Sequence, residues 1–241
     1  MPELLSLLTF IVCCFTILGM VKLFGKNGLF AYSAVVVVTA NIQVLKLTQY
    51  SLTSHPVALG TVLFSTIFVV DNVLTEYYGA QIAKRSVAIN FFCYLFFTLI
   101  MKITIWHPAV DGGECLNLHM ELKNIFSPCL SLFISSLIAY AIGQLVDISI
   151  FSLLKRLMKG KRISLRSFIS MSISTFLDNG IFSILVWIIF AEHPISLSVL
   201  WKTYILAAYI IRLVVAVLCV PLVKLCGFVV SGKPYVQKFW V

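Results

Sequence analysis

Four ionisable side chains stand inside long apolar segments of this sequence. They are Asp71, Asp147, Asp178 and Arg212. On insertion scales, each costs about 2.5–3.5 kcal/mol at the centre of a membrane-spanning helix. The stretch VVDNVLTEYYG, residues 69–79, shows the pattern most sharply, because it closes an apolar run with two carboxylates and an amide. Such groups are expected either to bind a ligand or an ion, or to pair with one another across helices.

Amide and hydroxyl side chains accompany these charges. They are Asn41, Gln43, Asn72, Gln144, Ser174, Thr175 and Asn179. Any one of them could simply join two helices through a hydrogen bond worth about 0.6 kcal/mol, and Asp178 could neutralise Arg212. Three aspartates from three helices fit that explanation poorly, because their charges repel unless protons, a cation or a ligand satisfies them. The set as a whole favours a polar cavity.

The composition indicates what kind of helices position these groups. Of the 241 residues, 61% are hydrophobic and 11% are charged, and the mean hydropathy is +1.04. A soluble protein of this composition could not cover its surface with polar groups. The chain is therefore expected to be an integral membrane protein. Its net charge of +9 is then interpreted as a bias in membrane orientation, and no nucleic-acid partner is expected.

Seven apolar runs are long enough to cross about 30 Å of hydrocarbon. They are residues 4–24, 29–50, 57–78, 86–106, 128–155, 166–190 and 200–225. The sequence thus predicts an all-α, polytopic protein with about seven transmembrane helices in a single domain, residues 1–241.

Basic residues predict the orientation of these helices. Thirteen of the 18 Lys and Arg residues fall on one side, within 22–26, 84–85, 155–166 and 224–238. The positive-inside rule makes that side cytoplasmic, which gives an N-out, C-in protein of the cytoplasmic (inner) membrane. Asp71 and Asp147 then lie in the inner third, so the cavity is expected to open toward the cytoplasmic half.

Three further features leave alternatives open. Glu76, at an inner helix end, could be a rim residue or a site residue, and Lys46 could extend to the outer interface or serve a site. The external connection 107–128 carries His107, Asp111, Glu114 and His119. His, Asp and Glu are residue types that can bind a metal ion, but the spacing of these four matches no known metal-binding pattern and favours a solvated connection. Neither a metal nor a cofactor is expected.

Several segments together resemble a known family. KLFGKNGLFA, TANIQVLK, VVDNVLTEYYGAQIAKR, AYAIGQLVDISIFSLLKR and STFLDNGIF resemble, in order and spacing, the queuosine precursor transporters, within the broader vitamin-uptake-like membrane proteins. The resemblance implies import of 7-deazaguanine bases (preQ0, preQ1 or queuine) for modification of the tRNA wobble base. It also implies functional roles for Asn41, Gln43, Lys46, Asp71, Glu76, Gln144, Asp147 and Asp178. The sequence departs from the family pattern at Asn72, Asn179 and Arg212.

The residues fit such a ligand, and other functions stay open. A carboxylate can accept the N–H and NH2 edge of a deazaguanine, an amide or Arg212 can donate to its carbonyl, and an aromatic side chain can cover its face. No Walker motif is present, so facilitated or proton-linked uptake is expected, with the base, lipid and protons as partners. The alternatives are a substrate-capture (S-component-like) subunit of an energy-coupled vitamin uptake system, a scaffold, or an intramembrane enzyme using Asp147 and Asp178. The sequence lacks the Gly-x-Gly-Asp signature that an intramembrane aspartic protease is expected to carry. No oligomeric state is predicted.

Overall fold

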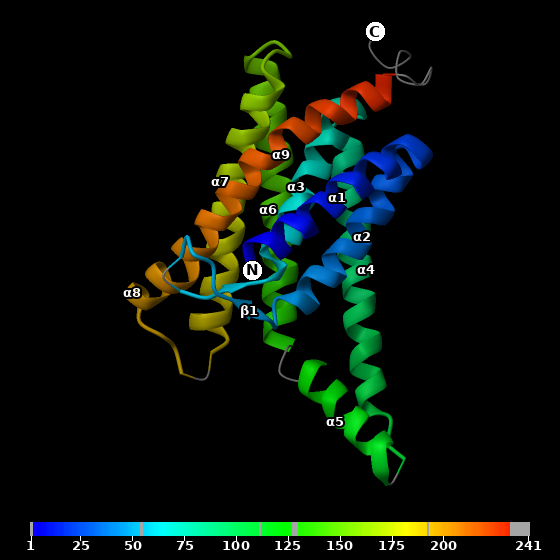
Figure 1. Ribbon diagram of the computed structural model, residues 1–241, viewed down its shortest axis with the longest axis vertical. Coiled ribbons are helices and arrows are strands. Elements are labelled where there is room, and N and C mark those ends of the chain that lie inside the picture. Colours follow the sequence, from blue (N-terminus) through cyan, green and yellow to red (C-terminus); the bar gives the residue numbers. More distant parts are fainter. Residues whose placement is uncertain (1, 54, 111, 127–129, 192, 232–241) are drawn as a thin grey trace.

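The computed structural model describes residues 2–53, 55–110, 112–126, 130–191 and 193–231. Nearly all of this chain is helical, which confirms the all-α prediction. The long helices are α1 (Pro2–Phe24), α2 (Lys26–Gln43), α3 (Gly60–Tyr77), α4 (Ala80–Trp106), α6 (Leu130–Leu157), α7 (Ile163–Ile184) and α9 (Ala207–Ser231). They form one elongated bundle, with α5 (Gly113–Phe126) at one end (Figure 1).

Five segments of the described chain are long and apolar enough to cross a membrane, against the seven that the sequence predicts. They are Pro2–Phe24, Ala80–Trp106, Ser131–Leu157, Ile163–Ile189 and Leu197–Val230. Helices α2 and α3 exist where they are predicted, but each has only 18 residues and carries polar side chains. The fold is thus that of an all-α membrane protein built around these two more polar helices.

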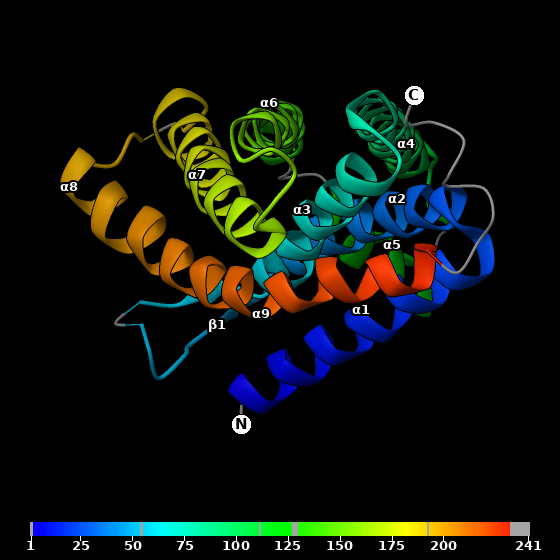
Figure 2. The same cartoon turned by 90° about the horizontal axis from the view of Figure 1, so that it is seen from above.

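Helix α3 lies at the centre of the bundle (Figure 2). Every residue from Gly60 to Thr75 is buried except Phe64, because α1, α2, α4, α6 and α9 all pack against it. A helix surrounded by protein meets little lipid, so it can carry Asp71 and Asn72 without exposing them to hydrocarbon. Placement at the centre explains how an apolar run can end in acidic residues.

The prediction of one helix over residues 29–50 is wrong at its C-terminal end. Helix α2 stops at Gln43, where the backbone N–H groups of Leu45 and Lys46 turn back to the carbonyls of Ile42 and Gln43. The chain then forms β1 (Leu47–Thr48), which pairs antiparallel with β2 (Val57–Ala58). Lys46 therefore lies in a turn between α2 and β1, outside the helix. The next predicted helix likewise begins at Gly60 rather than at residue 57.

Other helix limits also differ from the predictions. Helix α4 begins at Ala80, six residues before the predicted start at residue 86. The predicted external connection contains α5, an exposed helix with no buried side chain. Asp111 and residues 127–129 lie outside the described chain, as do the basic residues after Ser231. Among the described residues, no group of three or more His, Cys, Asp or Glu side chains gathers in a way that could hold a metal ion.

Two π-helical segments interrupt the last two long helices. Leu185–Ile189 (η1) continues α7, and Leu200–Leu206 (η2) joins the short α8 (Leu197–Val199) to α9. A π-helix lengthens the hydrogen-bonded repeat by one residue and changes where the following side chains point. Such segments often accompany functional sites. Both lie at the end of the bundle that carries α8 and the β1–β2 hairpin (Figure 1).

Candidate functional site

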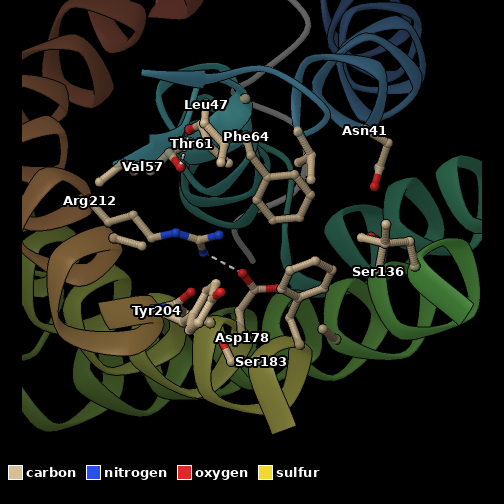
Figure 3. Close-up of a pocket in the computed structure, with 18 of the residues that line it drawn as sticks. Asn41, Leu47, Val57, Thr61, Phe64, Ser136, Asp178, Ser183, Tyr204 and Arg212 are labelled. Carbon is tan, nitrogen blue, oxygen red and sulfur yellow. Dashed lines mark hydrogen bonds and ion pairs between the residues drawn. The ribbon is translucent and has the colours of Figure 1, made fainter. Parts of the chain in front are cut away.

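A pocket of about 350 Å³ opens at the end of the bundle that carries the hairpin and the π-helical segments. A volume of this size suits a small molecule, since ligand pockets run from about 300 to 1,000 Å³. Its walls come from α2, β1, β2, α3, α6, α7, η1, η2 and α9 (Figure 3). The polar side chains among them are those of Asn41, Thr61, Ser136, Asp178, Asn179, Ser183, Thr203, Tyr204 and Arg212.

An ion pair between Asp178 and Arg212 lies in this pocket (Figure 3). The Arg212 guanidinium, from α9, donates to the Asp178 carboxylate, from α7. Asp178 is 3% exposed and Arg212 is 8% exposed. Because each charge offsets the other, the pocket presents both an anionic acceptor and a cationic donor without a net charge. A planar ligand with donors on one edge and a carbonyl on another would match this arrangement.

Aromatic rings flank the ion pair. The Phe64 ring lies 5.5 Å from the Arg212 guanidinium carbon, a distance at which the ring face attracts the cation. On the far side, the rings of Trp187 in η1 and Tyr204 in η2 stack with centroids 4.5 Å apart. The two π-helical segments therefore bring two aromatic rings together at the pocket. Flat apolar faces of this kind can cover a ring-shaped ligand.

The two pocket asparagines serve different purposes. Asn41 donates its amide N–H to the carbonyl of Val37 in its own helix, at 2.8 Å, and so leaves its side-chain oxygen as an acceptor. Asn179 donates to the carbonyl of Ile205 at 2.8 Å. Ile205 lies in η2, so this bond ties α7 to the π-helical segment. Asn41 can thus contact a ligand directly, whereas Asn179 positions the wall.

A second group of predicted residues lies deeper in the bundle and does not line the pocket. Asp71, Asn72, Gln144 and Asp147 are all fully buried. Within the described chain, no hydrogen-bond partner reaches the carboxylate oxygens of Asp71 or the amide of Gln144, and Asp147 has the hydroxyls of Ser170 and Ser174 beside it. The structure thus separates these residues from Asp178 and Arg212, which the sequence placed in the same cavity.

Glu76 belongs to a third place, at the opposite end of the bundle. Its carboxylate accepts two hydrogen bonds from the fully buried Arg166, at 2.9 and 3.1 Å, and it lies 3.2 Å from the Lys155 ammonium. Arg166 also donates to the carbonyls of Gly160 and Lys161. This network joins the end of α3 to the α6–α7 connection and closes that end of the bundle.

Two residues that the resemblance marks as functional lie apart from the pocket. The side chain of Lys46 is exposed. Gln43 is partly buried, and its side-chain oxygen has no partner in the described chain. Neither lines the pocket, although their neighbours Val44, Leu45 and Leu47 do.

Two hollows bear on the sequence prediction of a cavity. The half of the bundle that holds the fully buried Asp71 and Asp147, called the packed half below, carries a smaller hollow of about 270 Å³ near its end, between α4 and α6. The larger pocket opens beside the hairpin, where α7 and α9 adjoin π-helical segments. Its aromatic walls, from Phe64, Trp187 and Tyr204, were not predicted individually, because a sequence rich in Phe and Tyr gives no sign of which rings face a cavity.

Comparison with known proteins shows the family of the chain. A family model described as "Putative vitamin uptake transporter" matches residues 58–226. The "Probable queuosine precursor transporter" of Bacillus subtilis (strain 168) is 29% identical over 203 residues, which are 83% of this chain and 83% of that protein. No solved structure matches the chain. The matches and the apolar helices identify an integral protein of the bacterial cytoplasmic membrane with a small-molecule substrate. Because the family model covers well over half of the chain, the protein belongs to the vitamin uptake transporter family, as its resemblance to queuosine precursor transporters predicts.

Proposed function

We propose that this protein imports 7-deazaguanine queuosine precursors across the cytoplasmic membrane and binds them in the pocket beside Asp178. The observation that carries the proposal is the buried Asp178–Arg212 pair in a ring-lined pocket of about 350 Å³. The carboxylate would accept the N–H and NH2 edge of the base, and Arg212 would donate to its carbonyl. Phe64 and Tyr204 would cover its faces. The likeness to a queuosine precursor transporter supports this ligand class.

The orientation predicted from the basic residues completes the proposal. With the loops after α1, α3 and α6 in the cytoplasm, the pocket faces the outside and the Glu76–Arg166 network closes the inner end. The structure then corresponds to an outward-facing carrier. Seven crossings, which count α2 and the enclosed α3 in addition to the five apolar segments, give this orientation. Cysteine accessibility at Ser51 and at Lys159 tests it, because reagents that do not cross the membrane should label position 51 alone in whole cells.

The balanced charge of the pocket favours one precursor over another. A cationic ligand such as preQ1 would meet Arg212 in the same space as Asp178, whereas a neutral base such as preQ0 would not. We therefore expect preQ0 to compete for uptake more strongly than preQ1, by about tenfold if the difference is 1.4 kcal/mol. The fate of the imported base is incorporation into tRNA, and no catalytic step by this chain is proposed.

Uptake of labelled preQ0 by cells that cannot make it tests the proposal. Cells that carry the protein should accumulate the label, and unlabelled preQ0 should suppress it while adenine does not. The purified chain alone in liposomes should also exchange labelled for unlabelled base. Exchange that requires an added ATPase and coupling protein would instead make the chain a substrate-capture subunit. Absence of both uptake and binding for every deazaguanine would refute the proposal.

A further inference from the structure

Two carboxylates that the pocket does not use face one another inside the packed half of the bundle. Asp71 on α3 and Asp147 on α6 lie close enough for their charges to interact. Both are fully buried. In the described chain Asp71 has no hydrogen-bond donor, and Asp147 has the hydroxyls of Ser170 and Ser174 beside it but no cation. Two buried anions without a cation would be very costly, so a pair of this kind holds at least one proton.

The groups around the pair are polar but neutral. Tyr140 on α6 faces Asp71, and its hydroxyl accepts a hydrogen bond from Asn90 on α4 at 3.0 Å. Ser170 and Ser174 on α7 lie beside Asp147, and both are fully buried.

The two buried arginines of the described chain are already paired with other carboxylates. Arg166 on α7 is bound to Glu76 on α3, with Lys155 of α6 beside it. Arg212 on α9 is bound to Asp178. The cysteines of α1, Cys13 and Cys14, interact with Tyr32 of α2 and with Cys219 and Cys226 of α9. Glu3 of α1 binds Ser51.

Asp147 lies near the level of the pocket. Asp178 packs against α6 at Gly143, so closely that a Cβ at this glycine would come within 2.9 Å of the Asp178 Cβ. Asp147 is four residues beyond Gly143 on α6, and Ser174 is four residues before Asp178 on α7. Four residues of an α-helix rise about 6 Å, so Asp147 lies about 6 Å below the level of the pocket carboxylate. The buried Ser174 hydroxyl lies beside Asp147 at that level.

From this geometry we infer that Asp71 and Asp147 form a proton-binding site, separate from the substrate pocket, that couples uptake to the inward movement of protons. The inference rests on the proposed function and deepens it. A neutral base gains nothing from the membrane potential, whereas a base carried with one proton moves one positive charge. The proton passes from water in the pocket to a carboxylate oxygen of the pair. It leaves to cytoplasmic water when the inner end opens, so protons and charge balance over one cycle.

The energy available to such a site is substantial. One unit of pH difference is worth about 1.36 kcal/mol per proton, which supports about tenfold accumulation. A potential of 100 mV adds about 2.3 kcal/mol per charge, or about forty-fold more.

The decisive experiment uses purified protein in liposomes that contain a pH-sensitive dye. Exchange of labelled preQ0 against internal preQ0, at equal pH on both sides, requires only the pocket and tests the proposed function. Net uptake under an inward gradient of one pH unit tests the proton site. The wild-type protein should accumulate preQ0 about tenfold and acidify the lumen in step with the base. The double variant D71N/D147N should keep its exchange but lose both accumulation and acidification.

Controls make each outcome decisive. E114Q removes an exposed carboxylate from α5 and should behave like the wild type. Retained exchange in D71N/D147N shows that the variant is folded, and the single variants D71N and D147N provide intermediate cases. The inference is overturned if the double variant still accumulates base and acidifies the lumen. It is also overturned if a sodium gradient drives wild-type uptake in place of the pH gradient, or if folded D71N and D147N both lose exchange, because the carboxylates would then bind substrate.

Discussion

The two halves of this helix bundle treat buried polar side chains in opposite ways. Around the pocket, Asp178 and Arg212 neutralise one another and are reached from outside. In the packed half, Asp71 and Asp147 are enclosed without a described cation. A buried pair can exchange one partner for a ligand, whereas a buried carboxylate without a cation is stabilised by a proton. The difference is the basis for proposing that the first layer binds substrate and the second couples uptake to protons.

Removal of the pocket carboxylate should have the largest effect. In D178A, Arg212 keeps a buried charge without an anion, a situation that typically costs about 3–5 kcal/mol. Uptake of labelled preQ0 should fall at least 100-fold, and the amount of folded protein should fall as well. Uptake per folded molecule, measured in membranes, checks the prediction.

The matched control neutralises both partners. D178N/R212Q should restore the amount of folded protein, because no charge is left unpaired, but it should not restore uptake. Recovery of uptake in this double variant would mean that the pair only supports the fold and that the ligand binds elsewhere.

The sequence predicts the polar residues better than it predicts their grouping. Insertion costs identify Asp71, Asp147, Asp178 and Arg212 without any structure, since each must have a compensating role. Grouping depends on helix rotation and depth. By distance from the inner ends of their predicted spans, Asp147 and Asp178 differ by only four residues, yet one interacts with Asp71 and the other pairs with Arg212. A difference in depth of about one helical turn is smaller than the error with which the ends of a membrane span can be predicted from sequence.

Three structural features had no usable signal in the sequence. The break after Gln43 occurs without proline or glycine, in a run that is apolar enough to continue as a helix. The π-helical segments consist of ordinary apolar and aromatic residues. Arg166 was counted among the cytoplasmic loop charges, but its guanidinium lies buried against Glu76. In each case, contacts with distant segments decide the local structure.

The closed end of the packed half can be weakened without touching the pocket. In R166M, Glu76 loses two hydrogen bonds but retains Lys155. The free energy of unfolding should therefore fall by about 2–3 kcal/mol, less than when a buried charge loses its only partner. Thermal unfolding of the purified protein should shift to lower temperature, while the KM for preQ0 stays within about twofold. K84M removes an exposed charge at the same end and should change neither quantity. A raised KM with normal stability would place Arg166 in the transport path.

The aromatic wall should contribute to affinity alone. Stacking of a base on an aromatic ring is worth about 1–3 kcal/mol by alanine substitution. F64A should therefore weaken binding of preQ0 by about 10-fold to 100-fold, as measured by titration calorimetry on the purified protein. F92A removes a ring that is 67% exposed and should bind like the wild type. Equal losses in both variants would indicate a general packing defect rather than a binding wall.

The smallest effect is expected at Lys46, where the family resemblance and the structure disagree. The resemblance gives this residue a functional role, but its side chain is exposed in the turn before β1 and does not line the pocket. K46A should therefore leave preQ0 uptake within about twofold of the wild type, because an exposed charge is screened by water and salt. The backbone carbonyl of Lys46, which accepts a hydrogen bond from Leu59 at 2.8 Å, survives the substitution and continues to hold the hairpin. A severe loss of uptake in K46A would show that the turn moves over the pocket during transport. The substrate site would then be complete only after the turn that carries Lys46 closes over the pocket.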